Sequence, residues 1–171
     1  MKNYNNILSP NKMASPRRFL HEGENLSIKS SDGVTFLVDR QAAEINGTIR
    51  DLLIDAPEGG IIPLPITSVL LDLVFEYCDH YRNEIPSKEH YLQEGLNEWE
   101  KAYMTRVSNR LIDLIKVAHY LQNAPLRWCC FRELSDRARN KNQAEINVIA
   151  GIPAATTYTP EQIEQAEIAT K

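Results

Sequence analysis

Cysteines and histidines are the residues of this sequence with the most capacity for nucleophilic or metal chemistry. The three cysteines, Cys78, Cys129 and Cys130, are odd in number, and their spacings suit no common zinc site. Neighbouring residues on a helix point about 100° apart, so Cys129 and Cys130 cannot readily share a bond or a metal ion. We therefore interpret all three as reduced, largely buried thiols of an intracellular protein.

The histidines and glycines predict no catalytic or nucleotide-binding site. None of the four histidines has a second ligand at metal spacing: His21, His80, His90 and His119. The glycines mark separate turns instead of a phosphate-binding loop, and no Gly-x-Ser-x-Gly elbow is present. Because catalysis requires converging groups, the sequence favours a binding protein that is not an enzyme and needs no metal or cofactor.

Charge and hydropathy narrow the class of partner. The chain has 171 residues, 43% of them hydrophobic, and a net charge of −4. A nucleic-acid-binding protein is normally basic, so we expect no nucleic-acid partner. No apolar run reaches the ~20 residues of a membrane span, and the N-terminus lacks a signal-peptide core. These features predict a soluble protein of the cytoplasm and nucleus, without a membrane partner.

The N-terminal stretch differs in composition from the rest of the chain. Residues 1–25 are polar and aperiodic, which is typical of a flexible arm. Ser9 and Ser15 each precede a proline and are candidate phosphorylation sites, although such pairs are common in polar tails that have no regulatory role.

Alternating apolar residues predict a small sheet after the arm. Two alternating runs, around Leu26 and Ile28 and around Phe36 and Val38, flank Asp32-Gly33, a strong signal for a β-hairpin. Residues 61–65 read as a third, short strand. Its two prolines lack N–H donors, so this piece can be only an edge strand or the end of a strand.

Helical spacing dominates the remainder. An apolar helix over about residues 66–81 carries the widest stripe: Ile66, Val69, Leu70, Leu73, Val74 and Tyr77. Residues 82–96 are polar and broken by proline and glycine, which predicts a mobile loop. Further helices follow to the C-terminus. We thus predict an α+β fold, a three-stranded sheet with helices over residues 26–122, extended by helices over residues 123–171.

Several of these segments resemble the S-phase kinase-associated protein family. They are Ser30-Ser31-Asp32-Gly33, Pro63-Leu64-Pro65, the run "LVFEYC" over 73–78 and the run "LIDLIKVAHYL" over 111–121. Members are adaptors of SCF-type cullin–RING ubiquitin ligases. The resemblance implies a BTB/POZ fold followed by an F-box-binding helical extension, with F-box proteins and a cullin as partners in ubiquitin-dependent degradation.

The resemblance also implies where these partners bind. The family's cullin-contacting Asn-Tyr-Leu motif aligns with residues 119–121, so the implied cullin-binding residues are His119, Tyr120 and Leu134. The implied F-box surface is an open apolar layer of helices formed by Ile112, Ile115, Leu126, Phe131, Ile146, Ile149, Ile152 and Tyr158. Pro160 aligns with a proline that is hydroxylated in some protist members, which makes it a candidate modification site.

Departures from the family pattern leave alternatives open. Lys116 and Arg137 replace a leucine and a methionine, Ala150 replaces a phenylalanine, and the family's closing tryptophan-containing tail is missing. One alternative is a paralogue that kept a single interface. Another is a BTB/POZ protein that forms a homodimer or a kinetochore-like assembly without a ubiquitin-ligase role.

Overall fold

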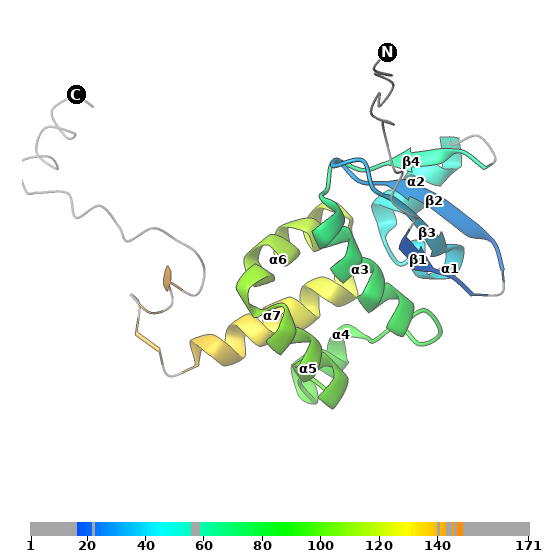
Figure 1. Ribbon diagram of the computed structural model, residues 1–171. Helices are drawn as coiled ribbons and strands as arrows, with labels where there is room; N and C mark the ends of the chain where they lie inside the picture. The colour runs from blue at the N-terminus through cyan, green and yellow to red at the C-terminus, as the bar shows by residue number, and fades with distance from the viewer. Residues whose placement is uncertain are drawn as a thin grey trace, which may run out of the picture.

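The computed structural model describes residues 17–21, 23–55, 59–139, 141–142, 145 and 147–148, and is drawn in Figure 1. Its sheet has the strand order β1-β3-β2-β4. The strands are β1 (Arg17–Phe19), β2 (Asn25–Lys29), β3 (Thr35–Asp39) and β4 (Ile61–Pro63). Strands β2 and β3 are antiparallel, whereas β1 and β4 run parallel to their neighbours at the two edges.

The predicted hairpin is confirmed. Ile28 pairs with Phe36 and Leu26 with Val38, so one face of both strands is buried. Gly33 in the turn has a φ of 85°, a left-handed conformation that glycine adopts without the steric cost of a side chain. The alternation in the sequence therefore translates directly into a buried sheet face.

The prediction of three strands is wrong by one, because β1 lies inside the segment expected to be a flexible arm. Arg17 forms an ion pair with Asp72 on the following long helix and lies over the Phe36 ring, while Phe19 packs against Phe75. These tertiary contacts hold a three-residue strand that shows no alternating pattern of its own. Ser9 and Ser15 lie outside the described residues.

Most of the described chain after the hairpin is helical. The helices are α1 (Arg40–Ala43), α2 (Gly47–Asp55), α3 (Ser68–His80), α4 (Lys88–Gln93), α5 (Glu98–Arg106), α6 (Leu111–Tyr120) and α7 (Ala124–Ala138), with a 3₁₀ turn, η1 (Ser108–Arg110). In Figure 1, α3 lies between the sheet with α1 and α2 on one side and the group α4–α7 on the other. Among the described residues, no helix is long and apolar enough to cross a membrane. The small sheet and the helices packed around it make an α+β architecture, as predicted.

The prediction of a mobile loop over residues 82–96 is wrong. This segment contains α4, and its Tyr91 and Leu96 are buried in the core. The Tyr91 hydroxyl lies 2.7 Å from the Tyr77 hydroxyl and donates to Glu100 at 2.7 Å. The burial of Tyr91 and Leu96 holds this segment against the core, although its polar composition indicates mobility.

Asp32 links the hairpin turn to the start of α3 by hydrogen bonds. Because these bonds depend on its charge, we expect the fold to lose stability in acid. Its carboxylate accepts hydrogen bonds from the Ser68 backbone N–H and hydroxyl, both at 2.7 Å, and these bonds lower its pKa to about 2. A carboxyl with a depressed pKa stabilises the fold above its ordinary value of 3.8 and loses that contribution as the pH falls towards 2. Urea midpoints measured at about pH 5 and about pH 2 should fall further for the wild type than for Asp32→Asn. Equal falls would contradict this assignment.

Candidate protein-binding surfaces

Helices α6 and α7 form a tight antiparallel pair joined by residues 121–123. Gln122 in this turn adopts a left-handed φ of 54°. Arg137 near the end of α7 donates to the backbone carbonyls of Ser108 and Met104, which precede α6. The second helix therefore runs back along the first, and their outer faces form one continuous layer.

Asn123 fixes the position at which α7 starts. Its side chain is fully buried, and its Oδ1 accepts from the Leu126 backbone N–H at 3.0 Å, an N-cap. Its Nδ2 donates to Asn46 Oδ1 at 3.0 Å and lies 3.3 Å from Cys78 Sγ. Asn46 is also buried and donates to the Ala43 carbonyl. This polar cluster joins α7 to α3 and to the α1–α2 connection.

The structure brings together two of the three residues predicted to contact a cullin. His119 and Tyr120 end α6 and are both exposed, the tyrosine to 46%. The Tyr120 carbonyl accepts a 2.7 Å bond from the Thr48 hydroxyl, which ties this end of α6 to α2. Leu134 is half-buried and lies ten residues into α7, about 15 Å from its first residue at the helical rise. It therefore does not share a patch with Tyr120.

The predicted F-box layer is present only in part. Ile112 and Ile115 are half-buried one turn apart on α6, and Phe131 on α7 is 47% exposed. Leu126 does not lie on this exposed layer as expected. It is fully buried, because the capped first turn of α7 directs it into the core. The remaining predicted residues lie outside the described part of the chain: Ile146, Ile149, Ile152 and Tyr158, together with the modification candidate Pro160.

Charged residues adjoin Ile112 in a cleft of about 510 Å³ between α6 and α7. Its lining includes Lys116 and Arg137, both departures from the family pattern, and also Val148. Lys116 is exposed, whereas Arg137 is half-buried and paired with Glu133 at 2.7 Å. Asp113 also lines the cleft and pairs with Lys116 at 3.9 Å, so both cations of the lining have a carboxylate partner.

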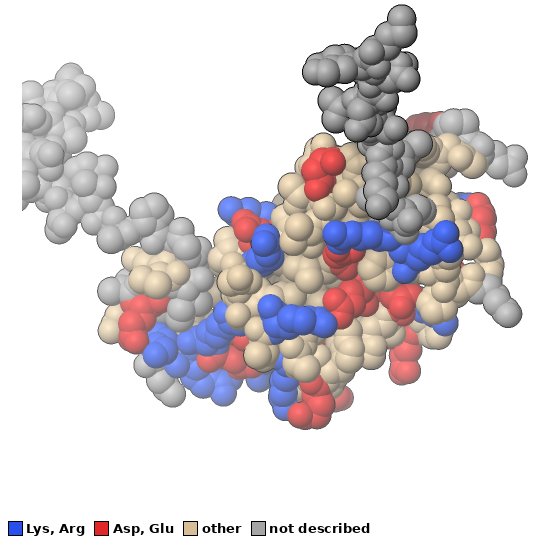
Figure 2. Space-filling model, viewed as in Figure 1, with Lys and Arg blue, Asp and Glu red and all other residues tan. Residues whose placement is uncertain are grey.

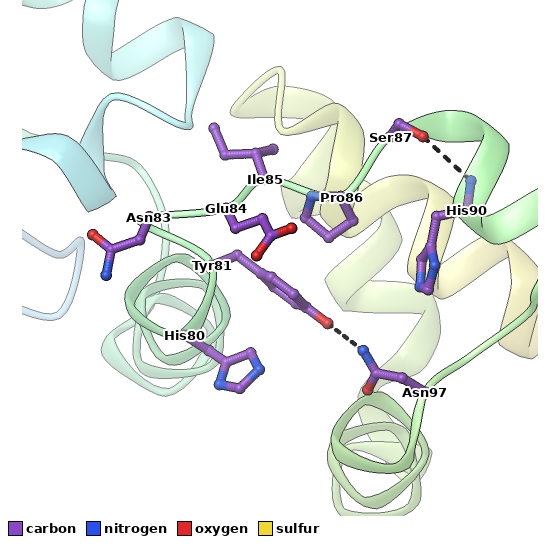
Figure 3. Close-up of a pocket in the computed structure, with 9 residues that line it drawn as sticks. All are labelled: His80, Tyr81, Asn83, Glu84, Ile85, Pro86, Ser87, His90 and Asn97. Carbon is purple, nitrogen blue, oxygen red and sulfur yellow. Dashed lines mark hydrogen bonds between the residues drawn. The ribbon is translucent and has the colours of Figure 1, made fainter.

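A second, polar pocket of about 660 Å³ lies beside the α3–α4 connection (Figure 3). Figure 3 shows the Tyr81 hydroxyl bonded to Asn97, at 2.9 Å, and the Ser87 hydroxyl accepting from the His90 backbone. His80 stacks on Trp99 with ring centroids 3.7 Å apart, and partial desolvation lowers the pKa of its imidazole although the residue is exposed. None of the predicted partner-binding residues lines this pocket. Within the described ranges, no three His, Cys, Asp or Glu side chains gather as metal ligands.

The cysteines are buried free thiols, as predicted. Burial raises the pKa of Cys78 and of Cys130 to about 12, and that of Cys129 also rises. A thiol that stays protonated at neutral pH is a poor nucleophile, so these three residues act as core packing.

Sequence reasoning missed an apolar groove between α4 and α7. Leu92 on α4 and Phe131 on α7 border it, and both are largely exposed. In α7, Trp128, Phe131 and Ser135 recur at helical spacing, but the polar composition of residues 82–96 gives no sign of the helix α4 that faces them. On the face drawn in Figure 2, acidic and basic side chains are interspersed.

Comparisons with known proteins identify a family model and several relatives that this chain resembles. Residues 24–83 match the model of the Skp1 family tetramerisation domain. The E3 ubiquitin ligase complex SCF subunit sconC of Aspergillus clavatus is 30% identical over 147 residues, which cover 82% of this chain and 91% of that protein. The suppressor of kinetochore protein 1 of Schizosaccharomyces pombe is 28% identical over 149 residues, with the same two shares. The SKP1-like protein 10 of Arabidopsis thaliana is 27% identical over 145 residues, covering 84% and 94%.

Proposed function

This chain belongs to the Skp1 family, and from that premise we propose that it is a non-catalytic adaptor of an SCF-type ubiquitin ligase, joining an F-box substrate receptor to a cullin. The observation that carries the proposal is the similarity to a relative named as an SCF subunit over 82% of the chain. That similarity extends well beyond the BTB/POZ part into the helices that would hold the F-box protein.

The adaptor works by positioning. Catalysis belongs to the other subunits of the ligase, and this chain sets the distance and orientation between them. Such a role needs a stiff body between two surfaces. The buried Asn46–Asn123 cluster and the Thr48–Tyr120 hydrogen bond supply that stiffness, because they tie the C-terminal helix pair to the BTB/POZ part through contacts far apart in sequence.

We propose the two partner surfaces at the positions that the family resemblance implies, and the exposure of their residues supports this proposal. We assign the cullin to the end of α6, where His119 and Tyr120 stand out from the body, and the F-box protein to the layer that contains Ile112, Ile115 and Phe131. An F-box helix would cover these half-exposed apolar side chains as a further helix completes a bundle. We expect the assembly to work in the cytoplasm and nucleus.

Tyr120→Lys tests the cullin surface. An exposed aromatic at the centre of an interface is typical of a binding hot spot, so the substitution is expected to weaken cullin binding by at least about 30-fold, or 2 kcal/mol. F-box binding should persist, because Tyr120 lies at the opposite end of α6 from Ile112. The measurement is co-purification of the full chain with a co-expressed cullin N-terminal domain and, separately, with an F-box protein.

The matched control is Glu98→Lys, an exposed charge change on α5 that belongs to neither proposed surface and should spare both partners. Binding of both partners by the wild type and selective loss of the cullin in Tyr120→Lys would support the adaptor. F-box binding without any cullin binding by the wild type would instead identify a paralogue with one interface. Binding of neither partner would overturn the proposed function.

A further inference from the structure

The C-terminal end of α6 has backbone carbonyls that need donors from outside the helix, because the last four C=O groups of an α-helix lack intrahelical partners. The turn that follows supplies two of these donors. The N–H of Gln122 donates to the His119 carbonyl at 3.1 Å, and that of Asn123 donates to the Ala118 carbonyl at 2.9 Å. With Gln122 in a left-handed conformation, these two bonds form a Schellman motif. Two carbonyls are left for donors from elsewhere in the chain.

Thr48, in the first turn of α2, supplies both of the remaining donors. Its hydroxyl donates to the Tyr120 carbonyl at 2.7 Å, and its backbone N–H donates to the Leu121 carbonyl at 3.1 Å. The positive N-terminal end of α2 therefore meets the negative C-terminal end of α6, which is a favourable arrangement of the two helix dipoles. A residue 72 positions earlier in the sequence thus completes the hydrogen bonding of the helix end that carries Tyr120.

Gly47 allows α2 to come this close. The residue is buried, and a Cβ added to it would lie 3.0 Å from both Cβ and Oε1 of Gln122, closer than ordinary van der Waals contact. Gln122 already has a φ of 54°, a conformation that is unfavourable for a residue with a Cβ. The fit between Gly47 and Gln122 therefore determines where the turn after Tyr120 lies.

The same helix end carries the side chains assigned to the cullin. His119 and Tyr120 are both exposed, so core packing fixes their side chains only in part. Contact residues of a binding site need supporting hydrogen bonds that hold them in the productive geometry. At this surface, the support acts on the backbone of the last turn of α6, and it comes from α2.

We propose that Thr48 and Gly47 are positioning residues for the cullin surface: they fix the last turn of α6 and thereby the place and direction of Tyr120. The inference rests on the proposed function, which assigns a cullin to this surface. It adds that α2 shapes the surface through the backbone of α6. The layer assigned to the F-box protein contains Ile112, at the other end of α6, and should not respond to changes at these two positions.

Thr48→Val tests the hydroxyl, because valine keeps the β-branched shape and removes the donor. We expect it to weaken binding of the cullin N-terminal domain by about threefold to tenfold, the value of one hydrogen bond, and to leave the F-box Kd within about twofold. Thr48→Ser retains the hydroxyl and should restore the cullin affinity. The matched control is Thr105→Val on α5, where an exposed threonine hydroxyl donates to the Lys101 carbonyl at 2.8 Å, and it should change neither Kd. Both Kd values are measured by titrating the purified full chain.

Gly47→Ala separates positioning from contact, because a buried residue cannot touch the cullin. The added Cβ should displace Gln122 and weaken cullin binding by about threefold to tenfold. Gln122→Gly removes the side chain that the new Cβ meets, and glycine suits the left-handed turn. The double variant should therefore bind the cullin as well as Gln122→Gly alone does. F-box binding by the same chains shows that their bodies remain folded.

Equal cullin affinities of the wild type and Thr48→Val would overturn this inference and leave the proposed function intact. A loss in Gly47→Ala that persists in the presence of Gln122→Gly would do the same. Parallel losses of cullin and F-box binding in Thr48→Val would show a general structural role and would also overturn the positioning role. Absence of cullin binding by the wild type would overturn the proposed function and this inference together.

Discussion

Replacing Glu100 by alanine is expected to lower the free energy of unfolding by about 3 to 5 kcal/mol. The Glu100 side chain is fully buried, and its carboxylate accepts from the Tyr81 hydroxyl at 2.8 Å, the Tyr91 hydroxyl at 2.7 Å and the Asn97 backbone N–H at 2.8 Å. Alanine would leave these donors buried without an acceptor, and it would remove the side chain that joins α3, α4 and α5.

Urea unfolding followed by circular dichroism measures the effect. Glu100→Gln keeps one oxygen acceptor and the shape of the side chain, so its loss should lie between those of the wild type and Glu100→Ala. Glu98→Ala on the same helix is the control, because Glu98 is exposed and its ion pair among the described residues is with Lys101 at the surface. Its unfolding midpoint should stay close to that of the wild type. An equally small effect of Glu100→Ala would show that water replaces the carboxylate.

Asn123→Ala is expected to cost about 2 to 4 kcal/mol, the second-largest effect. The change removes the N-cap of α7 and leaves the buried Asn46 amide oxygen without its donor. Because Asn123 accepts from the backbone N–H groups of Leu126 and Arg127, the first turn of α7 should also fray, which amide hydrogen exchange of these two residues would detect.

A double-mutant cycle separates the two contributions of Asn123. If the Asn46–Asn123 bond is important, Asn46→Ala and Asn123→Ala should be non-additive by about 1 kcal/mol or more. If only the cap matters, the two losses should simply add. Asn109→Ala, an exposed asparagine in η1, serves as the control and should change stability by less than about 0.5 kcal/mol.

The elements that the sequence predicted well are those with repeated apolar spacing. The hairpin over residues 25–39 and the helices α3, α6 and α7 each bury a regular stripe, and periodicity reports such stripes directly. The start of α3 was less well predicted. The apolar stripe indicates a helix from about residue 66, but the Ser68 backbone N–H donates to Asp32, and the helix begins at Ser68.

The elements that were missed depend on contacts distant in sequence. Strand β1 exists because Arg17 and Phe19 meet α3 residues, and α4 exists because Tyr91 reaches Glu100 and Tyr77. Leu126 illustrates the same limit at the candidate site: its apolar character fits a surface and a core equally, and only the capped turn decides. For Tyr120, the sequence alone left exposure undecided, and the resemblance supplied the role.

The two edges of the sheet affect the tendency of this protein to aggregate at high concentration. Each edge strand, β1 and β4, is only three residues long. The first carries Arg17 and Arg18, and the second ends in Pro63, which has no N–H to offer. Short edges marked by charge and proline are poor templates for another strand. The described sheet is therefore guarded against edge-to-edge aggregation, and the N-terminal residues that appeared to be a spare arm provide half of that protection.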